Sequence, residues 1–163
     1  MAGMFNLHCT QKLRDRLKAR AVEPVQTAHW LSNWYATILP WRPQMALLVN
    51  EQTLLPVIVP LAPSATFVHR IPFEVTRMLQ AMGLSHDPWE AELLGWKSAA
   101  ICKTANRSLL GTMNEFCFLA QVYRDHKDLH DPLSISMTLA GTPCGGAQGY
   151  RYPKDLVRQM ALN

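Results

Sequence analysis

The stretch KTANRSLLGTMNEF, residues 103–116, carries side chains suited to bind an anion. Lys103 and Arg107 are cationic and lie four residues apart. Asn106 and Ser108 add hydrogen-bonding groups to the same loop. The loop leads into a predicted helix, and the first amides and positive dipole end of a helix attract a phosphate or carboxylate. These four residues are therefore the candidate ligand site.

The start of that helix is predicted near Thr112, because Thr112-Met113-Asn114-Glu115 fits the S/T-x-x-E capping box. Such a cap occupies amides that an anion would need, and the Glu115 carboxylate would repel the anion. The stretch also departs from the phosphate-loop pattern G-x-x-x-x-G-K-S/T, since its lysine precedes the loop. Three interpretations stay open: anion or nucleic-acid contact, catalysis, and a structural loop in which Arg107 pairs with a carboxylate.

A second basic surface is predicted in TQKLRDRLKAR, residues 10–20. Its cationic residues surround a narrow stripe formed by Leu13 and Leu17 and are Lys12, Arg14, Arg16, Lys18 and Arg20. A basic amphipathic helix can follow a phosphate backbone or simply form a solvated face. The stripe is too narrow to favour membrane binding.

The histidines and cysteines give weaker signals. His126 and His130 have the helical spacing of a metal-binding pair, but the run lacks the HExxH glutamate, so no metal site is expected. Cys144 lies in a glycine-rich stretch and is the better candidate for a reactive thiol. Cys9 follows His8, but adjacent strand residues point to opposite faces and would not form a nucleophile–base pair.

Aromatic residues cluster in the region of the first predicted hairpin and comprise Trp30, Trp34, Tyr35 and Trp41. With Arg42 beside them, they could stack nucleobases on a sheet surface. Tryptophan on strands is more often part of a core, and no RNA-recognition signature accompanies these residues.

Composition indicates a folded protein without a disulfide framework. The chain has 163 residues, of which 48% are hydrophobic and 17% charged, and a net charge of +4. This suits one domain, predicted at residues 4–163 with residues 1–3 as an extension. The four cysteines show no CxxC pair, which favours reduced thiols. No signal peptide or membrane span is recognised, so a cytoplasmic protein is expected.

Hydrophobic periodicity places these sites on a set of predicted elements. Strands are predicted at residues 5–9, 32–39, 44–50, 54–59, 98–103 and 133–139. Helices are predicted at residues 11–19, from Pro72 to Gly83, from the Asp87 cap to Gly95, from Thr112 onward and at 153–162. Residues 140–150 read as a flexible loop. The order predicts a single α+β domain: a mixed, mainly antiparallel sheet, an N-terminal strand–helix unit, a three-strand meander and packed helices.

The segments MFNLHCTQKL, NWYAT, LLVNEQTLLPVIVPL, KTANRSLLGTMNEF and TPCG resemble a family of short, uncharacterised bacterial proteins defined only as a domain of unknown function. The resemblance covers residues 4–144. NRSLLGTMNEF is also similar to a motif of a plasmid- and transposon-passenger family described as ORF-3-like. Neither resemblance implies a catalytic residue; the second is a hint towards nucleic acid and mobile elements.

The sequence thus favours a non-catalytic binding or accessory protein that contacts an anion or nucleic acid through Lys103, Asn106, Arg107 and Ser108. No cofactor is expected. One alternative is a small nuclease or phosphoryl-handling enzyme, which needs His8, His126 or a carboxylate within reach of the loop. The other is a structural module that contacts a protein partner, with Arg107 buried in an ion pair.

Overall fold

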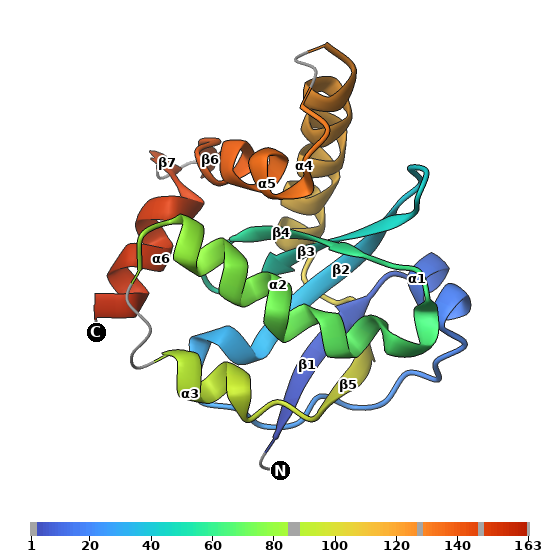
Figure 1. Cartoon of the computed structure of the whole chain (residues 1–163). Coiled ribbons are helices and arrows are strands. Elements are labelled where there is room, and N and C mark those ends of the chain that lie inside the picture. Colours follow the sequence, from blue (N-terminus) through green and yellow to red (C-terminus); the bar gives the residue numbers. More distant parts are fainter. Residues whose placement is uncertain (1–2, 85–88, 127–128, 147–148, 163) are drawn as a thin grey trace.

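The computed structural model describes residues 3–84, 89–126, 129–146 and 149–162. A five-stranded sheet in the order β4-β3-β2-β1-β5 forms its centre (Figure 1). The strands of this sheet are β1 (Met4–Cys9), β2 (Asn33–Leu39), β3 (Met45–Asn50), β4 (Pro56–Pro60) and β5 (Ser98–Lys103). The helices are α1 (Gln11–Leu17), α2 (Phe67–Ala81), α3 (Trp89–Leu94), α4 (Arg107–His126), α5 (Pro132–Ala140) and α6 (Pro153–Leu162).

The sheet is mixed, as predicted. β1 runs parallel to both of its neighbours, β2 and β5, whereas β2, β3 and β4 form the predicted antiparallel meander. A small antiparallel hairpin, β6 (Cys144–Gly146) with β7 (Gly149–Arg151), lies in the region predicted as a flexible loop. The α+β class and the N-terminal strand–helix unit are confirmed.

Each face of the sheet carries its own hydrophobic core. The first core includes Leu7 of β1, Leu13 of α1 and Phe67 of α2. The second core includes Tyr35 of β2 and Phe116 of α4, with α5 packed beside them. Figure 1 accordingly shows α2 in front of the sheet and α4 behind it. Because α1 and α4 cover opposite faces, the chain leaves β1 and β5 in opposite directions.

Residues 133–139 are not a strand, as the alternation predicted, but belong to helix α5. The Asp131 carboxylate accepts a hydrogen bond from the Ser134 amide at 3.1 Å, and Pro132 occupies the first turn. The Ser136 hydroxyl donates to the Pro132 carbonyl at 2.9 Å, so a polar side chain within the helix finds a local partner. Ile135 and Leu139, one turn apart, are buried. The helix-capping residues Asp131 and Pro132 therefore determine the structure of this segment, although its alternating apolar residues predicted a strand.

Helix α2 begins at Phe67, and Pro72 lies inside it instead of in its first turn. The Arg70 guanidinium donates to the carbonyls of Pro60, Leu61 and Pro63, and this anchors the early turns to the end of β4. Gly83 has a φ of +79° just after the helix, as expected for its predicted role as terminator. The predicted cap at Asp87 and Pro88 lies outside the described residues.

Helix α1 is shorter than predicted and ends at Leu17, because Lys18 adopts a left-handed conformation. Among the described residues, no helix is both long enough and apolar enough to cross a membrane.

Candidate ligand-binding site

Helix α4 begins at Arg107, well before the predicted start at Thr112. The Asn106 side-chain oxygen accepts a hydrogen bond from the Leu109 amide at 3.0 Å, which is the geometry of an N-cap. The Thr112 hydroxyl instead donates to the Ser108 carbonyl at 3.4 Å, within the helix. The predicted capping box is therefore wrong, because Leu109 and Met113 already belong to the buried stripe and extend the helix backwards.

The four predicted site residues lie together where β5 leads into α4. Lys103 ends β5, Asn106 caps α4, and Arg107 and Ser108 open the helix. All four side chains are exposed. Within the described residues, the Arg107 guanidinium has no hydrogen bond or ion pair, so the buried ion pair of the structural interpretation is not found.

A cavity of about 610 Å³ opens beside this junction, at the carboxyl ends of β1 and β5. Its lining residues come from both strands, from the β5–α4 loop and from the segment after α1, and are His8, Ala21, Val22, Glu23, Pro24, Cys102, Lys103, Thr104 and Ala105. We call it the carboxyl-edge cavity. Arg107 does not line it, and Ser108 instead lines a separate cleft of about 430 Å³ beside the β6–β7 hairpin.

The position of the cavity follows from the topology. β1 and β5 are adjacent and parallel, with Cys9 paired to Lys103 at their carboxyl ends. The helices that follow these strands, α1 and α4, contribute to cores on opposite faces. Where neighbouring parallel strands send their chains to opposite faces, the diverging loops leave a crevice, and open α/β sheets bind ligands there.

His8 is the buried polar group of this cavity, with only 8% of its surface exposed. Its ring stacks on Tyr35 at a centroid distance of 4.6 Å, and its Nδ1 lies 3.0 Å from the Lys103 carbonyl oxygen. A carbonyl only accepts, so Nδ1 carries the hydrogen. Nε2 has no partner among the described residues. The ring therefore presents a free nitrogen in this cavity. From the sequence, His8 was considered only as a possible partner for Cys9 or for the Lys103–Ser108 loop.

Asn6 fixes the outer wall of the cavity. Its side-chain amide donates to the Val25 carbonyl at 2.7 Å and accepts from the Val25 amide at 2.8 Å. The Val22 amide donates to the Ile101 carbonyl at 2.9 Å. These bonds hold residues 21–25, here called the edge segment, against β1 and β5 without forming a strand. The sequence signal was a polar residue in a mostly apolar strand, and in the structure only 1% of Asn6 is exposed.

The charges around the cavity are mixed. Lys103 and Glu23 are both exposed at its rim. Burial raises the pKa of the Cys102 thiol, and the Glu23 carboxylate raises that pKa further. The Cys102 thiol also donates to the Ala100 carbonyl at 3.3 Å, so it is a neutral group. The cavity thus combines an imidazole, an ammonium and a carboxylate, which can bind a polar ligand or transfer protons.

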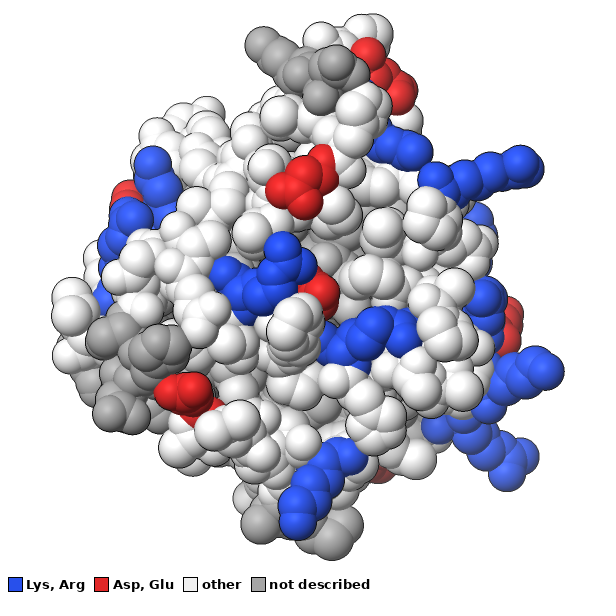
Figure 2. Space-filling view, viewed as in Figure 1, with Lys and Arg blue, Asp and Glu red and all other residues white. Residues whose placement is uncertain are grey.

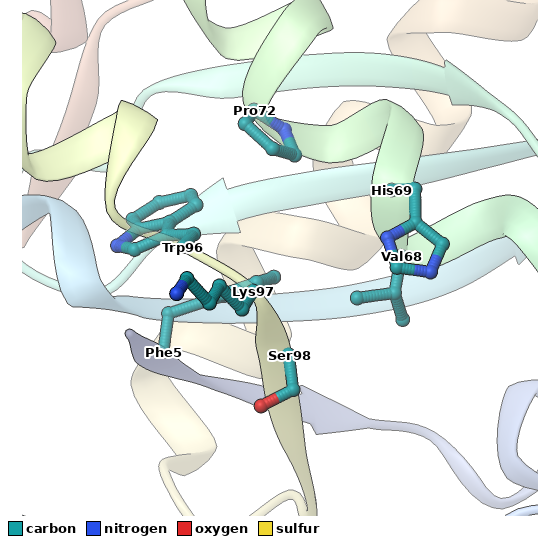
Figure 3. Close-up of a pocket in the computed structure, with 7 residues that line it drawn as sticks. All are labelled: Phe5, Val68, His69, Pro72, Trp96, Lys97 and Ser98. Carbon is teal, nitrogen blue, oxygen red and sulfur yellow. The ribbon is translucent and has the colours of Figure 1, made fainter. Parts of the chain in front are cut away.

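A much smaller cavity of about 60 Å³ lies at the opposite ends of the same two strands (Figure 3). We call it the amino-edge cavity. It is lined by Phe5, Val68, His69, Pro72, Trp96, Lys97 and Ser98. The rings of Phe5 and Trp96 stack with centroids 4.2 Å apart, which fills most of this end with aromatic side chains.

The aromatic residues near the first hairpin are in the core, as the commoner interpretation expected, and do not form a nucleobase platform. Trp30, Trp34, Tyr35 and Trp41 are all buried. The Arg124 guanidinium covers the Trp41 ring at 4.7 Å, and the Trp41 indole donates to Gln121 at 2.8 Å. Neither face of this tryptophan is therefore an open stacking surface.

The basic helix α1 is only partly free. Arg14 donates to the Cys9 carbonyl at 2.7 Å, and Arg16 donates to the Gln44 side chain at 3.2 Å. Lys12, Lys18 and Arg20 are exposed. Figure 2 shows Lys and Arg side chains projecting from the side of the molecule where α1 lies in Figure 1.

The other thiols are poor nucleophiles. Burial raises the pKa of Cys9 to about 12 and that of Cys117 to about 11. Cys144 is half-buried, and burial raises its pKa despite the opposing effect of Arg151. The candidate reactive thiol is therefore not activated.

His126 and His130 do not form a helical pair, because α4 ends at His126 and His130 lies outside any described helix. Across residues 3–84, 89–126, 129–146 and 149–162, no three His, Cys, Asp or Glu side chains are grouped to hold a metal ion.

Comparison with known proteins identifies the domain. A family model described as a domain of unknown function (DUF6933) matches residues 6–156. The chain belongs to this family. The DUF6933 match runs from within β1 to the first turn of α6 and so includes the carboxyl-edge cavity. No curated protein and no solved structure matches the chain. The resemblance of NRSLLGTMNEF to the ORF-3-like motif stays a prediction.

Proposed function

We propose that this domain binds a small ligand with an oxyanion group in the carboxyl-edge cavity. The observation that carries the proposal is the buried His8 ring, which lines the cavity. One ring nitrogen is bonded to the Lys103 carbonyl, and the other has no partner in the part of the chain that the structure describes. An open cavity at a topological switch point is a frequent ligand site. Nε2 is not a fully buried atom, so it is open to water or to a ligand in the cavity.

The candidate residues have different roles in this proposal. Lys103 lines the cavity and supplies positive charge directly. Arg107 lies at the start of α4, outside the cavity lining, and adds a longer-range attraction. Asn106 holds the helix start through its bond to the Leu109 amide, and its own amide donates to the Tyr35 hydroxyl at 3.2 Å. Ser108 has no direct role in the cavity and shapes the first turn of α4.

The test uses inorganic phosphate as the probe, titrated at constant ionic strength and followed by the amide resonances of residues 101–107. We expect saturable shifts in these resonances, with Lys103→Ala weakening binding about threefold to tenfold because one charge-assisted contact is lost. Lys97→Ala is the matched control, since Lys97 is also exposed but lies before the other end of β5. Equal affinity in wild type and Lys103→Ala, or equal losses in both variants, would contradict the proposal.

A second candidate, contact with a nucleic-acid backbone, is favoured by the arrangement of the basic residues. The pairing of Cys9 with Lys103 brings the start of α1 next to the β5–α4 junction. The exposed cations of α1 and of the residues just after it therefore share one edge of the sheet with Lys103 and Arg107; they are Lys12, Lys18 and Arg20. Such an edge would contact phosphates without reading bases, because the tryptophans are buried.

This candidate is tested with a fluorescently labelled single-stranded DNA of random sequence. The affinity of a nucleic-acid binder falls steeply as the salt concentration rises. Arg107→Ala should lower the affinity, and it should reduce by about one the slope of the logarithm of the affinity against the logarithm of the salt concentration. An affinity that Arg107→Ala leaves unchanged in a folded variant would exclude this surface.

A further inference from the structure

We infer that the carboxyl-edge cavity takes up an anion together with one proton, which His8 accepts at Nε2. The inference rests on the proposed function and specifies the ligand: a fully ionised oxyanion such as a sulfate, a phosphate-ester dianion or a carboxylate. The proton comes from solvent, and no covalent bond is made or broken.

The hydrogen-bonding role of Nδ1 fixes what Nε2 can do. Because the Lys103 carbonyl oxygen, 3.0 Å away, can only accept, Nδ1 donates whether the ring is neutral or charged. A neutral ring therefore has its lone pair at Nε2, and this lone pair repels an oxygen that carries no hydrogen. The imidazolium has an N–H at Nε2 and donates to the same oxygen. An ionised oxyanion selects the protonated ring.

His29 has the opposite hydrogen-bonding arrangement at its Nδ1. The Leu31 amide donates to the His29 Nδ1 at 3.1 Å, so this nitrogen must be an acceptor. Protonating the His29 ring to an imidazolium would break that bond. The two histidines therefore have opposite ring chemistry: His8 can gain a proton without losing its backbone partner, and His29 cannot.

The groups around His8 set the balance between its two forms. On β2, Tyr35 lies flat against the ring, and on β5, Cys102 is a neutral thiol whereas Lys103 is a cation. The edge segment contributes the Glu23 carboxylate, and α4 starts with the Arg107 cation. The charged groups near the ring are therefore two cations and one carboxylate.

An anion that enters changes this balance. It adds negative charge next to Nε2, and this stabilises the imidazolium. By linkage, the gain in proton affinity on anion binding equals the gain in anion affinity on protonation. The anion and the proton are therefore bound cooperatively.

Calorimetric titration with sodium sulfate tests the inference, because sulfate stays doubly charged across the range from pH 5.5 to 8.5. Titrations in buffers of different ionisation enthalpy give the number of protons taken up. We expect uptake approaching one proton per sulfate at a pH above the His8 midpoint. Over the same range, affinity should fall about tenfold per pH unit.

Two variants separate the roles of the residues. His8→Gln cannot gain a charge, so it should bind sulfate with an affinity that does not depend on pH and without proton uptake. Lys103→Ala should keep the proton uptake while binding more weakly. His69→Gln, at the amino-edge cavity, is the matched control and should behave as wild type.

A readout on the wild-type protein does not depend on the folding of a variant. In NMR spectra of the histidine side chains, the midpoint of the His8 titration should move to higher pH when sulfate is added, and that of His69 should not. Sulfate binding without proton uptake and with an unchanged His8 midpoint would overturn the inference but leave the proposed function intact. Absence of binding by both sulfate and inorganic phosphate, even at pH 5.5, would overturn the proposed function itself.

Discussion

The two ends of β1 and β5 are built from similar residue types but in opposite ways. Each end has one histidine and one lysine beside a cavity: His8 and Lys103 at the carboxyl end, His69 and Lys97 at the amino end. At the amino end, stacked aromatic rings leave about 60 Å³. At the carboxyl end, the cavity measures about 610 Å³ and the histidine is buried.

The difference shows what separates a structural contact from a candidate site. The exposed His69 can satisfy both ring nitrogens with water, and its cavity has room for little else. The His8 ring is mostly buried, and among the described residues only its Nδ1 has a partner, whereas Nε2 stays open to the cavity. A histidine and a lysine near a cavity are therefore a weak signal, whereas a mostly buried ring with one nitrogen open to a large cavity is a stronger one.

The largest expected effect comes from removing the aromatic filling at the amino end. Trp96→Ala deletes a buried ring stacked on Phe5 and should lower the free energy of unfolding by about 3–5 kcal/mol. Urea denaturation followed by circular dichroism measures this loss. His69→Ala, at the exposed rim, should change the same quantity by less than about 0.5 kcal/mol. A loss below about 1 kcal/mol for Trp96→Ala would mean that the stack does not close this end.

The wall of the carboxyl-edge cavity should be the next most sensitive feature. Asn6→Ala leaves the backbone amide and carbonyl of Val25 without their partners and should cost about 1–3 kcal/mol. Hydrogen exchange should become faster at the Val22 and Val25 amides, because the edge segment loses its anchor. Asn114→Ala, an exposed position on α4, serves as the control. Unchanged exchange at Val25 would contradict the role assigned to Asn6.

The buried Cys9 thiol, at the carboxyl end of β1, predicts that the protein loses stability at alkaline pH. Burial raises the pKa of the Cys9 thiol from 9.0 to about 12, so the folded state retains a proton that the unfolded state releases. Stability from this group is complete below pH 9 and is lost as the pH rises towards 12. Wild type should therefore lose about 2 kcal/mol more than Cys9→Ala between pH 9 and pH 11. Parallel pH profiles of the free energy of unfolding would contradict the burial of this thiol.

The smallest expected effect distinguishes the two possible caps of α4. Asn106→Ala should lower the free energy of unfolding by about 1 kcal/mol, because it removes the acceptor for the Leu109 amide. Thr112→Ala should be neutral or slightly stabilising, since Thr112 lies inside the helix and alanine has the higher helix propensity. Thermal denaturation of the two variants decides between them. A larger loss of stability for Thr112→Ala than for Asn106→Ala would mean that Thr112 caps the helix after all.

The sequence predicted the sheet better than the site. Strands such as LLVN and PVIV were recognisable because buried apolar runs bounded by turn residues have few alternatives. The start of α4 was misplaced because two local caps competed, and burial of Leu109 decided in favour of Asn106. The roles of His8 and Asn6 depended on contacts with residues 95 and 19 positions away, which no local pattern encodes.

The most direct test of the account is the location of a bound anion. A crystal of the protein soaked in selenate, a sulfate analogue whose selenium scatters anomalously, shows where the anion lies. The account predicts an anomalous peak in the carboxyl-edge cavity, within hydrogen-bond distance of the His8 Nε2 and near the Lys103 ammonium. An empty carboxyl-edge cavity, with selenate bound at Lys97 or His69 instead, would contradict it.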